Sequence, residues 1–399
     1  MKSAIFALPI ATALWSACTP DSPQTDASHA PDSAAVETEP VYDRYWNDLA
    51  RYLAGLDPLP DSRLDSLEKR PEAVEHRRLM QKAWAFKDSV LLKKLDAWAE
   101  KEFADVRRMR RCVYYPLGGP DFITVHTLFP NAERYVLFGL EPEGKLPDLA
   151  QIPPERMAFN LHNARKTLDD LIKLSFFVTK AMIGDLSRAD FNGAVVPLLQ
   201  FVVARGNTIT NVRRILLDRS GRKTHLASWD SPPQTTLDSV VTGVEIAFKS
   251  AGDKKAPIQI VEYWSFDAQD LHLKNQKYLT DYLSGLKPAT GYMKAGSYLL
   301  HYLTFTRARE TVLHACDFLL QDDTGIGLRY FDRNVWDLKF YGKYDGPIPI
   351  FRDQYQHDLA LAYRNDTSVK ALDFLMGYKS PYGSTNLMIA RKKTPTIQP

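Results

Sequence analysis

Residues 112–142 read CVYYPLGGPDFITVHTLFPNAERYVLFGLEP, and this stretch decides the fold. Residues 112–115 are typical of a buried strand, and residues 116–121 are rich in the Gly and Pro of a tight turn. A short helix is expected over 122–129, and residues 135–140 indicate a second buried strand. A strand, a helix and a strand in this order predict a βαβ unit with two parallel strands.

The pattern continues outward from this unit and predicts an α/β body over residues 109–393, with a mixed sheet and helices on its faces. Helices are expected at 153–183, 188–204, 268–285 and 292–316, and strands at 209–217 and 318–321. Residues 244–248 and 258–264 predict a hairpin joined by a Gly/Asp/Lys loop.

Residues 42–108 are expected to form an N-terminal helical segment. Apolar residues at helical spacing predict one helix over 42–53 and a longer helix over 71–103. The apolar stripe of the longer helix favours core contact with the main body, and a groove for a partner helix is the alternative.

The first 17 residues have a basic start and then an uncharged, mostly apolar run, the pattern of a signal peptide. Ser16-Ala17-Cys18 resembles the lipobox of bacterial lipoproteins, although Trp15 stands where that family usually has leucine. The resemblance implies cleavage before Cys18, attachment of a fatty acid such as palmitate to Cys18, and a membrane as partner. Thr19 in place of aspartate implies the periplasmic face of the outer membrane. An ordinary signal peptide cut nearby and an uncleaved anchor are the alternatives, although the run is shorter than the roughly 18 residues that span a bilayer.

Residues 18–41 are rich in Pro, Ser, Ala and Asp and predict a disordered acidic tether, while residues 394–399 are expected to be frayed. Between residues 19 and 40 there are five acidic and no basic side chains. When residues 19–40 and Lys2 are left out, 50 basic and 43 acidic side chains remain in the rest of the chain, a net charge of about +7. This surplus could favour an anionic envelope ligand, such as a lipid head group, or serve solubility alone. Basic residues form no stripe with interleaved aromatics, so nucleic acid is not an expected partner.

Cys112 and Cys316 lie among apolar residues and could form a disulfide in an oxidising compartment or remain two separate buried thiols. The nine histidines are scattered without H-E-x-x-H or C-x-x-C motifs, so no metal site is expected. The sequence identifies no cofactor.

Polar residues at the carboxyl ends of strands are the candidate site, because ligands of open α/β sheets bind there. The candidate ligand-binding residues after the first strand are Tyr115, Gly118 and Gly119. The candidate acids, bases or cation ligands are Asp121, Glu141, Asp322 and Asp323. Turns and helix caps also favour Asp and Gly, so a purely structural role is the alternative.

Lys294, Ser297 and His301 fall on one face of the expected helix 292–316, and a Lys or His beside a Ser can activate it as a nucleophile. The order is K-x-x-S, the reverse of the S-x-x-K of penicillin-interactive enzymes. A polar ligand contact is therefore the other interpretation of these three residues.

Two further motifs are incomplete. Gly118-Gly119 followed by Glu141 is similar to a nucleotide-binding βαβ unit, but the pattern G-x-G-x-x-G does not occur. Asp323-Thr324-Gly325 is similar to an aspartic-protease loop, but those enzymes need two such loops, the chain has only one, and Ile326 stands where a Ser, Thr or Ala is usual.

The strings YYPLGGPDF (114–122), FPNA (129–132) and YVLFGLEP (135–142) resemble a family of uncharacterised bacterial envelope lipoproteins. The segment QDDTGI (321–326) and the pattern K-x-x-S-Y-L (294–299) are similar to other parts of that family. The resemblance implies an envelope location and brings no established catalytic residues.

Three functions follow as hypotheses. The first is a lipid-anchored protein whose α/β body binds an envelope ligand in a polar pocket with aromatic walls. The second is an envelope hydrolase that uses the acids at the strand ends. The third is a structural or assembly lipoprotein that acts through its N-terminal helices. Whether the chain is an enzyme is left open.

Overall fold

The structure, a computed structural model, describes residues 43–146, 148–174, 176, 189–226, 240–253, 255–286 and 289–393. The expected signal peptide, Cys18, the acidic tether and the tail 394–399 lie outside the described residues. Residues 40–399 form one compact unit. The N-terminal helices therefore share a unit with the sheet. The first strand of the sheet begins at Cys112, shortly after the expected boundary at residue 108.

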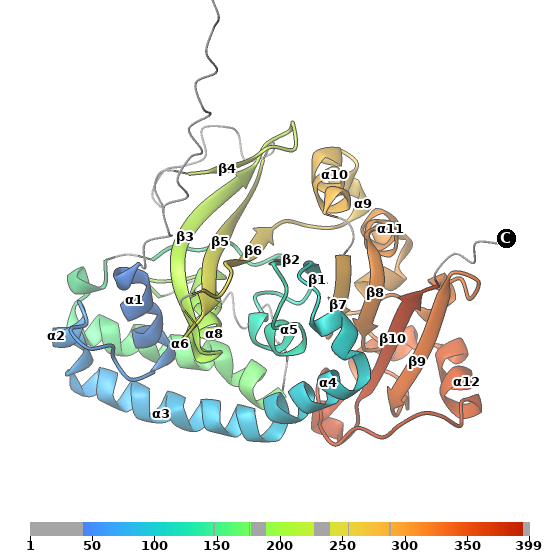
Figure 1. The fold of residues 1–399 in the computed structure, drawn as a ribbon, viewed down its shortest axis with the longest axis horizontal. Helices are drawn as coiled ribbons and strands as arrows, with labels where there is room; N and C mark the ends of the chain where they lie inside the picture. The colour runs from blue at the N-terminus through green and yellow to red at the C-terminus, as the bar shows by residue number, and fades with distance from the viewer. Residues whose placement is uncertain are drawn as a thin grey trace, which may run out of the picture. The chain divides into compact units, whose positions relative to one another are not determined.

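A ten-stranded mixed sheet forms the centre, in the order β4-β3-β5-β6-β2-β1-β7-β8-β10-β9 (Figure 1). The strands are β1 (Cys112–Pro116), β2 (Arg134–Gly139), β3 (Asn207–Leu217), β4 (Lys223–His225), β5 (Val241–Ser250), β6 (Gln259–Ser265), β7 (Ala289–Met293), β8 (Cys316–Gln321), β9 (Trp336–Gly342) and β10 (Asn386–Lys392). The five central strands, from β6 to β8, are parallel. Strands β3 to β5 extend one edge as antiparallel strands, and β10 runs antiparallel to both β8 and β9. The predicted α/β class with a mixed sheet is confirmed.

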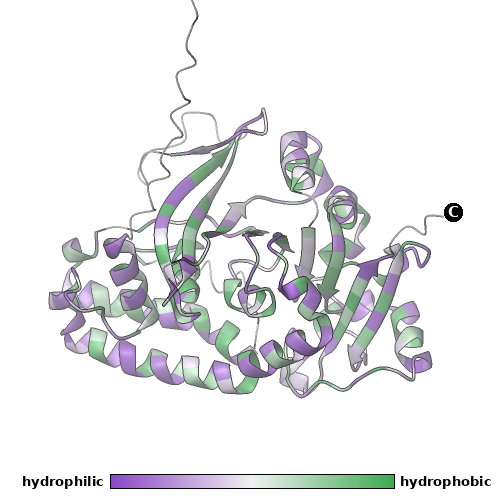
Figure 2. Ribbon diagram, viewed as in Figure 1, coloured by the Kyte–Doolittle hydropathy of each residue, from purple (hydrophilic) through white to green (hydrophobic). Residues whose placement is uncertain are grey.

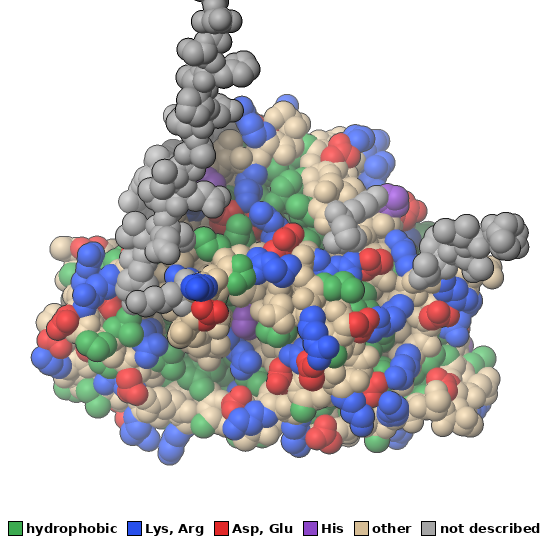
Figure 3. Space-filling model, in the orientation of Figure 1, with side chains coloured by type: hydrophobic (Ala, Val, Ile, Leu, Met, Phe, Trp, Pro, Cys, Tyr) green, Lys and Arg blue, Asp and Glu red, His purple; other side chains and the backbone are tan. Residues whose placement is uncertain are grey.

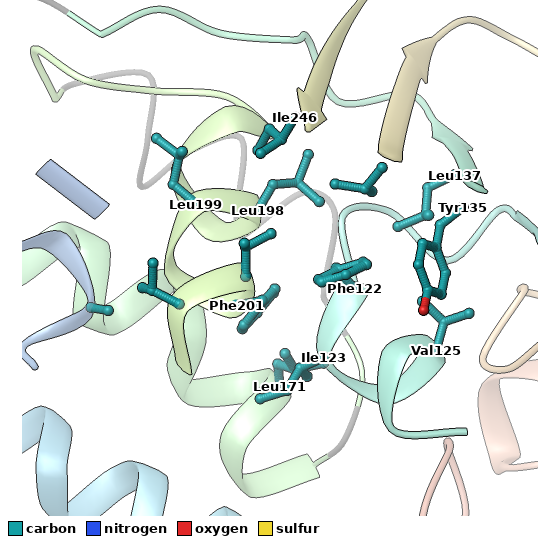
Figure 4. Packing of buried hydrophobic residues seen from close by; sticks show 14 of the residues in the cluster. Phe122, Ile123, Val125, Tyr135, Leu137, Leu171, Leu198, Leu199, Phe201 and Ile246 are labelled. Carbon is teal, nitrogen blue, oxygen red and sulfur yellow. The ribbon is translucent and has the colours of Figure 1, made fainter. Parts of the chain in front are cut away.

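Helices cover both faces of the sheet. They are α1 (Arg44–Ala54), α2 (Asp65–Glu68), α3 (Pro71–Lys87), α4 (Lys93–Arg107), α5 (Phe122–Leu128), α6 (Pro154–Leu174), α8 (Val195–Ala204), α9 (Asp270–Leu273), α10 (Lys277–Gly285), α11 (Thr306–Ala315) and α12 (His357–Asn365). One face packs against α1, α3, α4, α5, α6 and α8, and the other packs against α9 to α12. Figure 4 shows side chains of α5, α8 and β2 meeting in the first of these cores.

The βαβ unit that opens the body is as predicted. Cys112 pairs with Arg134 and Pro116 with Phe138, in a continuous parallel register between β1 and β2. The α5 helix begins after Asp121, whose side chain accepts a hydrogen bond from the backbone N–H of Thr124. This cap satisfies one of the donors that a helix N-terminus leaves free.

The long N-terminal helix belongs to the core. A π-helical turn (Asp88–Leu92) joins α3 to α4, and hydrophilic and hydrophobic bands alternate along both helices (Figure 2). Met80, Leu95 and Phe103 are fully or almost fully buried in the same cluster as the sheet. The prediction that the apolar stripe makes core contact is confirmed.

The predicted helix over 292–316 is wrong for its first half. Residues 289–293 form the central strand β7, and only residues 306–315 form the helix α11. Ala295, Ser297 and Tyr298 between them have left-handed backbone angles, with φ of 54°, 53° and 57°. A strand that is buried on both faces has no alternating pattern, so its short apolar run could not be told from a helix. Strands β9 and β10 were also not anticipated.

Cys112 and Cys316 are both buried free thiols. Both align with Ala289 in β7, so two strand spacings separate them. Two spacings are about 10 Å, beyond the roughly 7 Å between Cα atoms that a disulfide can bridge. The alternative of two separate thiols is therefore the one observed.

Candidate functional site

The candidate site lies where the direction of winding changes in the parallel sheet. The chain leaves β1 toward α5 on one face, and it leaves the neighbouring β7 toward α11 on the other face. When β1, β2 and β6 to β10 are numbered in chain order, their spatial order is 3-2-1-4-5-7-6. The first five positions follow the order of doubly wound sheets that bind dinucleotides, and the crevice beyond β1 and β7 is their binding place.

A buried ion pair bridges this crevice. Lys294 Nζ, from the residue after β7, lies 2.6 Å from Oδ2 of Asp121 in the loop after β1. The two side chains are 0% and 1% exposed. Oδ2 of Asp121 also accepts hydrogen bonds from the hydroxyls of Tyr115 (3.0 Å) and Thr124 (2.6 Å). Several donors thus compensate the desolvation of the carboxylate.

Asp322 approaches the same lysine from the end of β8. Its Oδ2 accepts a hydrogen bond from the backbone N–H of Ala295 (3.0 Å), and its Oδ1 accepts one from the backbone N–H of Thr324 (3.0 Å). Burial raises the pKa of Asp322, and these donors together with Lys294 oppose that rise. A Cβ atom at Gly377 would lie 2.6 Å from Oδ2, so only glycine lets that loop approach so closely.

Asp323 faces away from the ion pair. Its Oδ2 accepts a hydrogen bond from the hydroxyl of Tyr298 (2.6 Å), and its Oδ1 accepts one from Nδ2 of Asn386 (2.9 Å). Burial, with a further contribution from the neighbouring Asp322, raises the pKa of Asp323 to about 7. Asp323 lines a separate cavity of only about 10 Å³.

A small polar cavity of about 40 Å³ adjoins Lys294. Its lining residues are Tyr115, Leu117, Gly118, Gly119, Glu141, Phe176, Lys294, Ala295, Ser297 and Tyr378. The structure thus brings together six of the predicted site residues, which come from β1 and from the loops after β1, β2 and β7. Their assembly follows from the parallel register, because it brings the carboxyl ends of the three strands to one edge of the sheet.

Glu141 lines the cavity, and only one of its two carboxylate oxygens accepts a hydrogen bond from the described residues. Its Oε2 accepts a hydrogen bond from the hydroxyl of Tyr263 (2.7 Å), and the residue is 2% exposed. Within the described part of the chain, Oε1 receives no hydrogen bond, although it lies beside Gly119. A Cβ at Gly119 would lie 3.4 Å from Oε1, so the glycine keeps this oxygen open.

The arrangement proposed for Lys294, Ser297 and His301 is wrong, because these residues do not share a helix. The hydroxyl of Ser297 forms a hydrogen bond with that of Tyr378 at 2.8 Å. His301 lies in a 3₁₀ turn (Leu299–His301) and is not among the cavity residues. Burial lowers the pKa of His301 to about 4. Lys294 is committed to Asp121, so the geometry contains no activated Ser297.

Sequence reasoning missed Tyr378, Tyr263 and Thr124. Tyr378 follows Gly377, whose φ of 73° marks a tight turn, in a region where no element was predicted. Tyr263 was placed on a strand, but its partner Glu141 is 122 residues away in the chain. Thr124 lies three residues after Asp121 and could have been found as the donor to a helix-capping aspartate.

The described residues include no group of three or more His, Cys, Asp or Glu side chains placed to hold a metal ion. Among the described helices, none is long and apolar enough to cross a membrane. Comparisons with protein families, curated proteins and solved structures found no match to this chain.

Breaking the ion pair tests its importance for the fold. We expect Lys294→Met to lower the free energy of unfolding by about 3–5 kcal/mol, because Asp121 is left buried and unpaired. Adding Asp121→Asn to Lys294→Met removes that charge, so the double variant should be less unstable than the sum of the two single variants. Urea unfolding measures all four proteins. Strict additivity of the two single effects would contradict the coupling.

The raised pKa of Asp323 predicts that the free energy of unfolding depends on pH. The folded chain holds the Asp323 proton to about pH 7, whereas the unfolded chain releases it near the ordinary pKa of 3.8. The contribution of protonated Asp323 to the stability of the fold is therefore present at low pH and is lost as pH rises toward 7. Asp323→Asn resembles the protonated acid, so its stability relative to the wild type should increase between pH 5 and pH 8. A difference in urea unfolding that does not change with pH would contradict this assignment.

Proposed function

We propose that this chain is a lipid-anchored protein of the bacterial cell envelope whose α/β body binds a small hydroxyl-bearing ligand in the crevice between β1 and β7. The observation that carries the proposal is Glu141, a buried carboxylate that presents Oε1 to a polar cavity. The cavity is bounded by the aromatic rings of Tyr115, Phe176 and Tyr378 and contains neither an activated nucleophile nor a metal cluster of described residues.

The position of Glu141 favours a vicinal diol as the group that is bound. In doubly wound sheets an acid at the end of the second strand, about 20 residues after the glycine turn, accepts hydrogen bonds from ribose hydroxyls. Glu141 follows β2 and occupies this place relative to Gly118 and Gly119. A ribose or another sugar with adjacent hydroxyls has the matching donors.

The same crevice disfavours a phosphate. A dinucleotide pyrophosphate would lie at the N-terminus of the helix after β1, but the Asp121 carboxylate caps α5 there. Asp121, Asp322 and Glu141 all lie close to Lys294, and burial lowers the pKa of the second lysine near Asp121, Lys87, to about 7. An anionic group would therefore meet net negative charge, so we propose a nucleoside or a neutral sugar for this cavity rather than a nucleotide.

The cavity admits only part of such a ligand in the conformation described. A space of about 40 Å³ accommodates a few water molecules or one polar substituent. The rings of Phe176 and Tyr378 lie edge to face, with centroids 4.7 Å apart, and Phe351 stacks on Tyr378 at 5.6 Å. We propose that these rings rearrange when the remainder of the ligand enters.

The alternatives receive less support. A hydrolase that uses the strand-end acids would need two carboxylates on one substrate. Asp121 is paired with Lys294, and the cavity that Asp322 and Asp323 line is only about 10 Å³, room for about one water molecule. An assembly function through the N-terminal helices would need an unpartnered apolar face. The apolar stripe of α3 and α4 is packed in the core, which leaves Val74, Phe86 and Val90 as the exposed large apolar residues of this segment.

Metabolic labelling with a radioactive fatty acid tests the anchor. We expect label on the wild-type chain and none on Cys18→Ser, because the lipobox-like sequence directs acylation to Cys18. Label that persists in Cys18→Ser, or its absence from the wild type, would overturn the lipid anchor.

Titration calorimetry tests the crevice with adenosine, 2′-deoxyadenosine, S-adenosylmethionine, NAD and glucose as probes. We expect adenosine or glucose to bind and Glu141→Gln to weaken that binding by roughly 10- to 100-fold, through loss of hydrogen bonds to a charged acceptor. Weaker binding of 2′-deoxyadenosine than of adenosine identifies a ribose, whereas preference for glucose identifies a pyranose.

Glu133→Gln is the matched control, because it makes the same change at an exposed position before β2. The proposed crevice is refuted by the absence of binding for the whole panel, or by equal affinities of the Glu141→Gln and Glu133→Gln variants.

A further inference from the structure

A larger groove lies on the β3-β5-β6 end of the sheet, apart from the crevice at β1 and β7. Its volume is about 690 Å³, within the range of small-molecule sites. It is lined by the solvent-facing side of these strands and by the first residues of α1. On the face drawn in Figure 3, acidic and basic side chains are interspersed.

Two arginines of the groove have no salt-bridge partner among the described residues. Arg63 comes from the loop after α1 and Arg213 from β3, and both are exposed. No acidic side chain of the described residues forms a salt bridge with either guanidinium, and the hydrogen-bond partner of the Arg213 side chain among these residues is Nδ1 of His225 at 3.4 Å. Guanidinium groups at such positions are well suited to bind phosphate oxygens.

The acids of the groove are occupied by other partners. Glu245 lies 2.5 Å from Lys223 Nζ and 3.1 Å from His225 Nε2, and these partners help to lower the pKa of its carboxyl group. Asp43 caps α1 by accepting a hydrogen bond from the backbone N–H of Trp46 at 3.2 Å. Glu245 lies opposite Arg213 in the register of β3 and β5, but neither Glu245 nor Asp43 forms a salt bridge with a groove arginine at position 63 or 213.

Thr210 supplies a second and independent sign of a ligand. The register between β3 and β5 shifts between Ile209 and Asn211, so Thr210 is the extra residue of a β-bulge. Bulges frequently occur beside binding sites, where they redirect a side chain. Thr210 lines the groove and is 5% exposed, and its Oγ1 has no hydrogen-bond partner in the described structure. Such an unpaired hydroxyl is costly unless a bound molecule satisfies it.

The groove also has an apolar part. Ala247, Ile258 and Ile260 line it, and Ile258 is 38% exposed although it is a large hydrophobic residue. A ligand with one anionic end and one apolar end fits both parts of the groove.

We propose that this groove binds the head group of an anionic phospholipid, with Arg63 and Arg213 on the phosphate, Thr210 on a phosphate or glycerol oxygen, and the isoleucines against the start of the acyl chains. The inference rests on the proposed envelope location. It is favoured by the place of the groove, because Asp43 and Arg44 line it where the chain leads back to Cys18.

The test measures binding to vesicles by sedimentation. The full chain with Cys18→Ser is used, so that no acyl anchor contributes, and the vesicles are phosphatidylglycerol with phosphatidylethanolamine or phosphatidylcholine alone. We expect binding only to the anionic vesicles, about 30-fold weaker after Arg63→Ala and Arg213→Ala together. Thr210→Val should weaken binding several-fold without changing the net charge.

Arg352→Ala with Arg364→Ala is the matched control, because it removes the same charge at exposed positions on or near α12, beside the opposite edge of the sheet. Equal vesicle binding by the two double variants would overturn the proposal. So would tight, groove-dependent binding of glycerol 3-phosphate in calorimetry without vesicle binding, since the ligand would then be a soluble phosphate ester. Because the test uses neither Glu141 nor acylation, its failure is distinct from failure of the crevice or of the anchor.

Discussion

The buried pair of Lys294 and Asp121 is the interaction on which the centre of the structure depends. Each charge would be strongly disfavoured in the protein interior without the other, so the loops after β1 and β7 are held together. The hydroxyls of Tyr115 and Thr124 donate to the same carboxylate and align the strand end with the first turn of α5. The polar cavity adjoins this ion pair, because Lys294 and Tyr115, which both contact Asp121, also line the cavity.

The structure separates two kinds of electrostatic environment. Near the ion pair, three carboxylates lie close to Lys294, with Lys87 near Asp121, and the ligand we propose there is neutral and rich in hydroxyl groups. In the groove on β3, β5 and β6, neither Arg63 nor Arg213 forms a salt bridge with a described acidic side chain, and the ligand we propose there is anionic. The mildly basic composition of the body suggested an anionic ligand without a location. We propose that an anionic ligand binds in the groove and not in the crevice.

Local patterns in the sequence were sufficient for the βαβ unit, because each of its elements has its own turn residues and its own apolar run. They were also sufficient to place Glu141 and Asp121 at strand ends, since a parallel pair brings such residues to one edge. The contact between Lys294 and Asp121 joins residues 173 positions apart and could not be read from spacing. The strand β7 was mistaken for a helix, because burial on both faces removes the alternation that identifies a strand. Thr210 gave no signal, since a bulge is defined by the partner strand.

The position of β10 has a consequence for how the chain is made and exported. The last strand along the chain lies between β8 and β9, so the sheet is incomplete until residues 386–392 are present. The helices made first share their core with strands made much later. A nascent chain that emerges N-terminus first therefore cannot close its hydrophobic core early. If the signal peptide expected at residues 1–17 directs secretion, this delay leaves the chain unfolded, and therefore able to pass through a translocation pore, until its C-terminal end has been made.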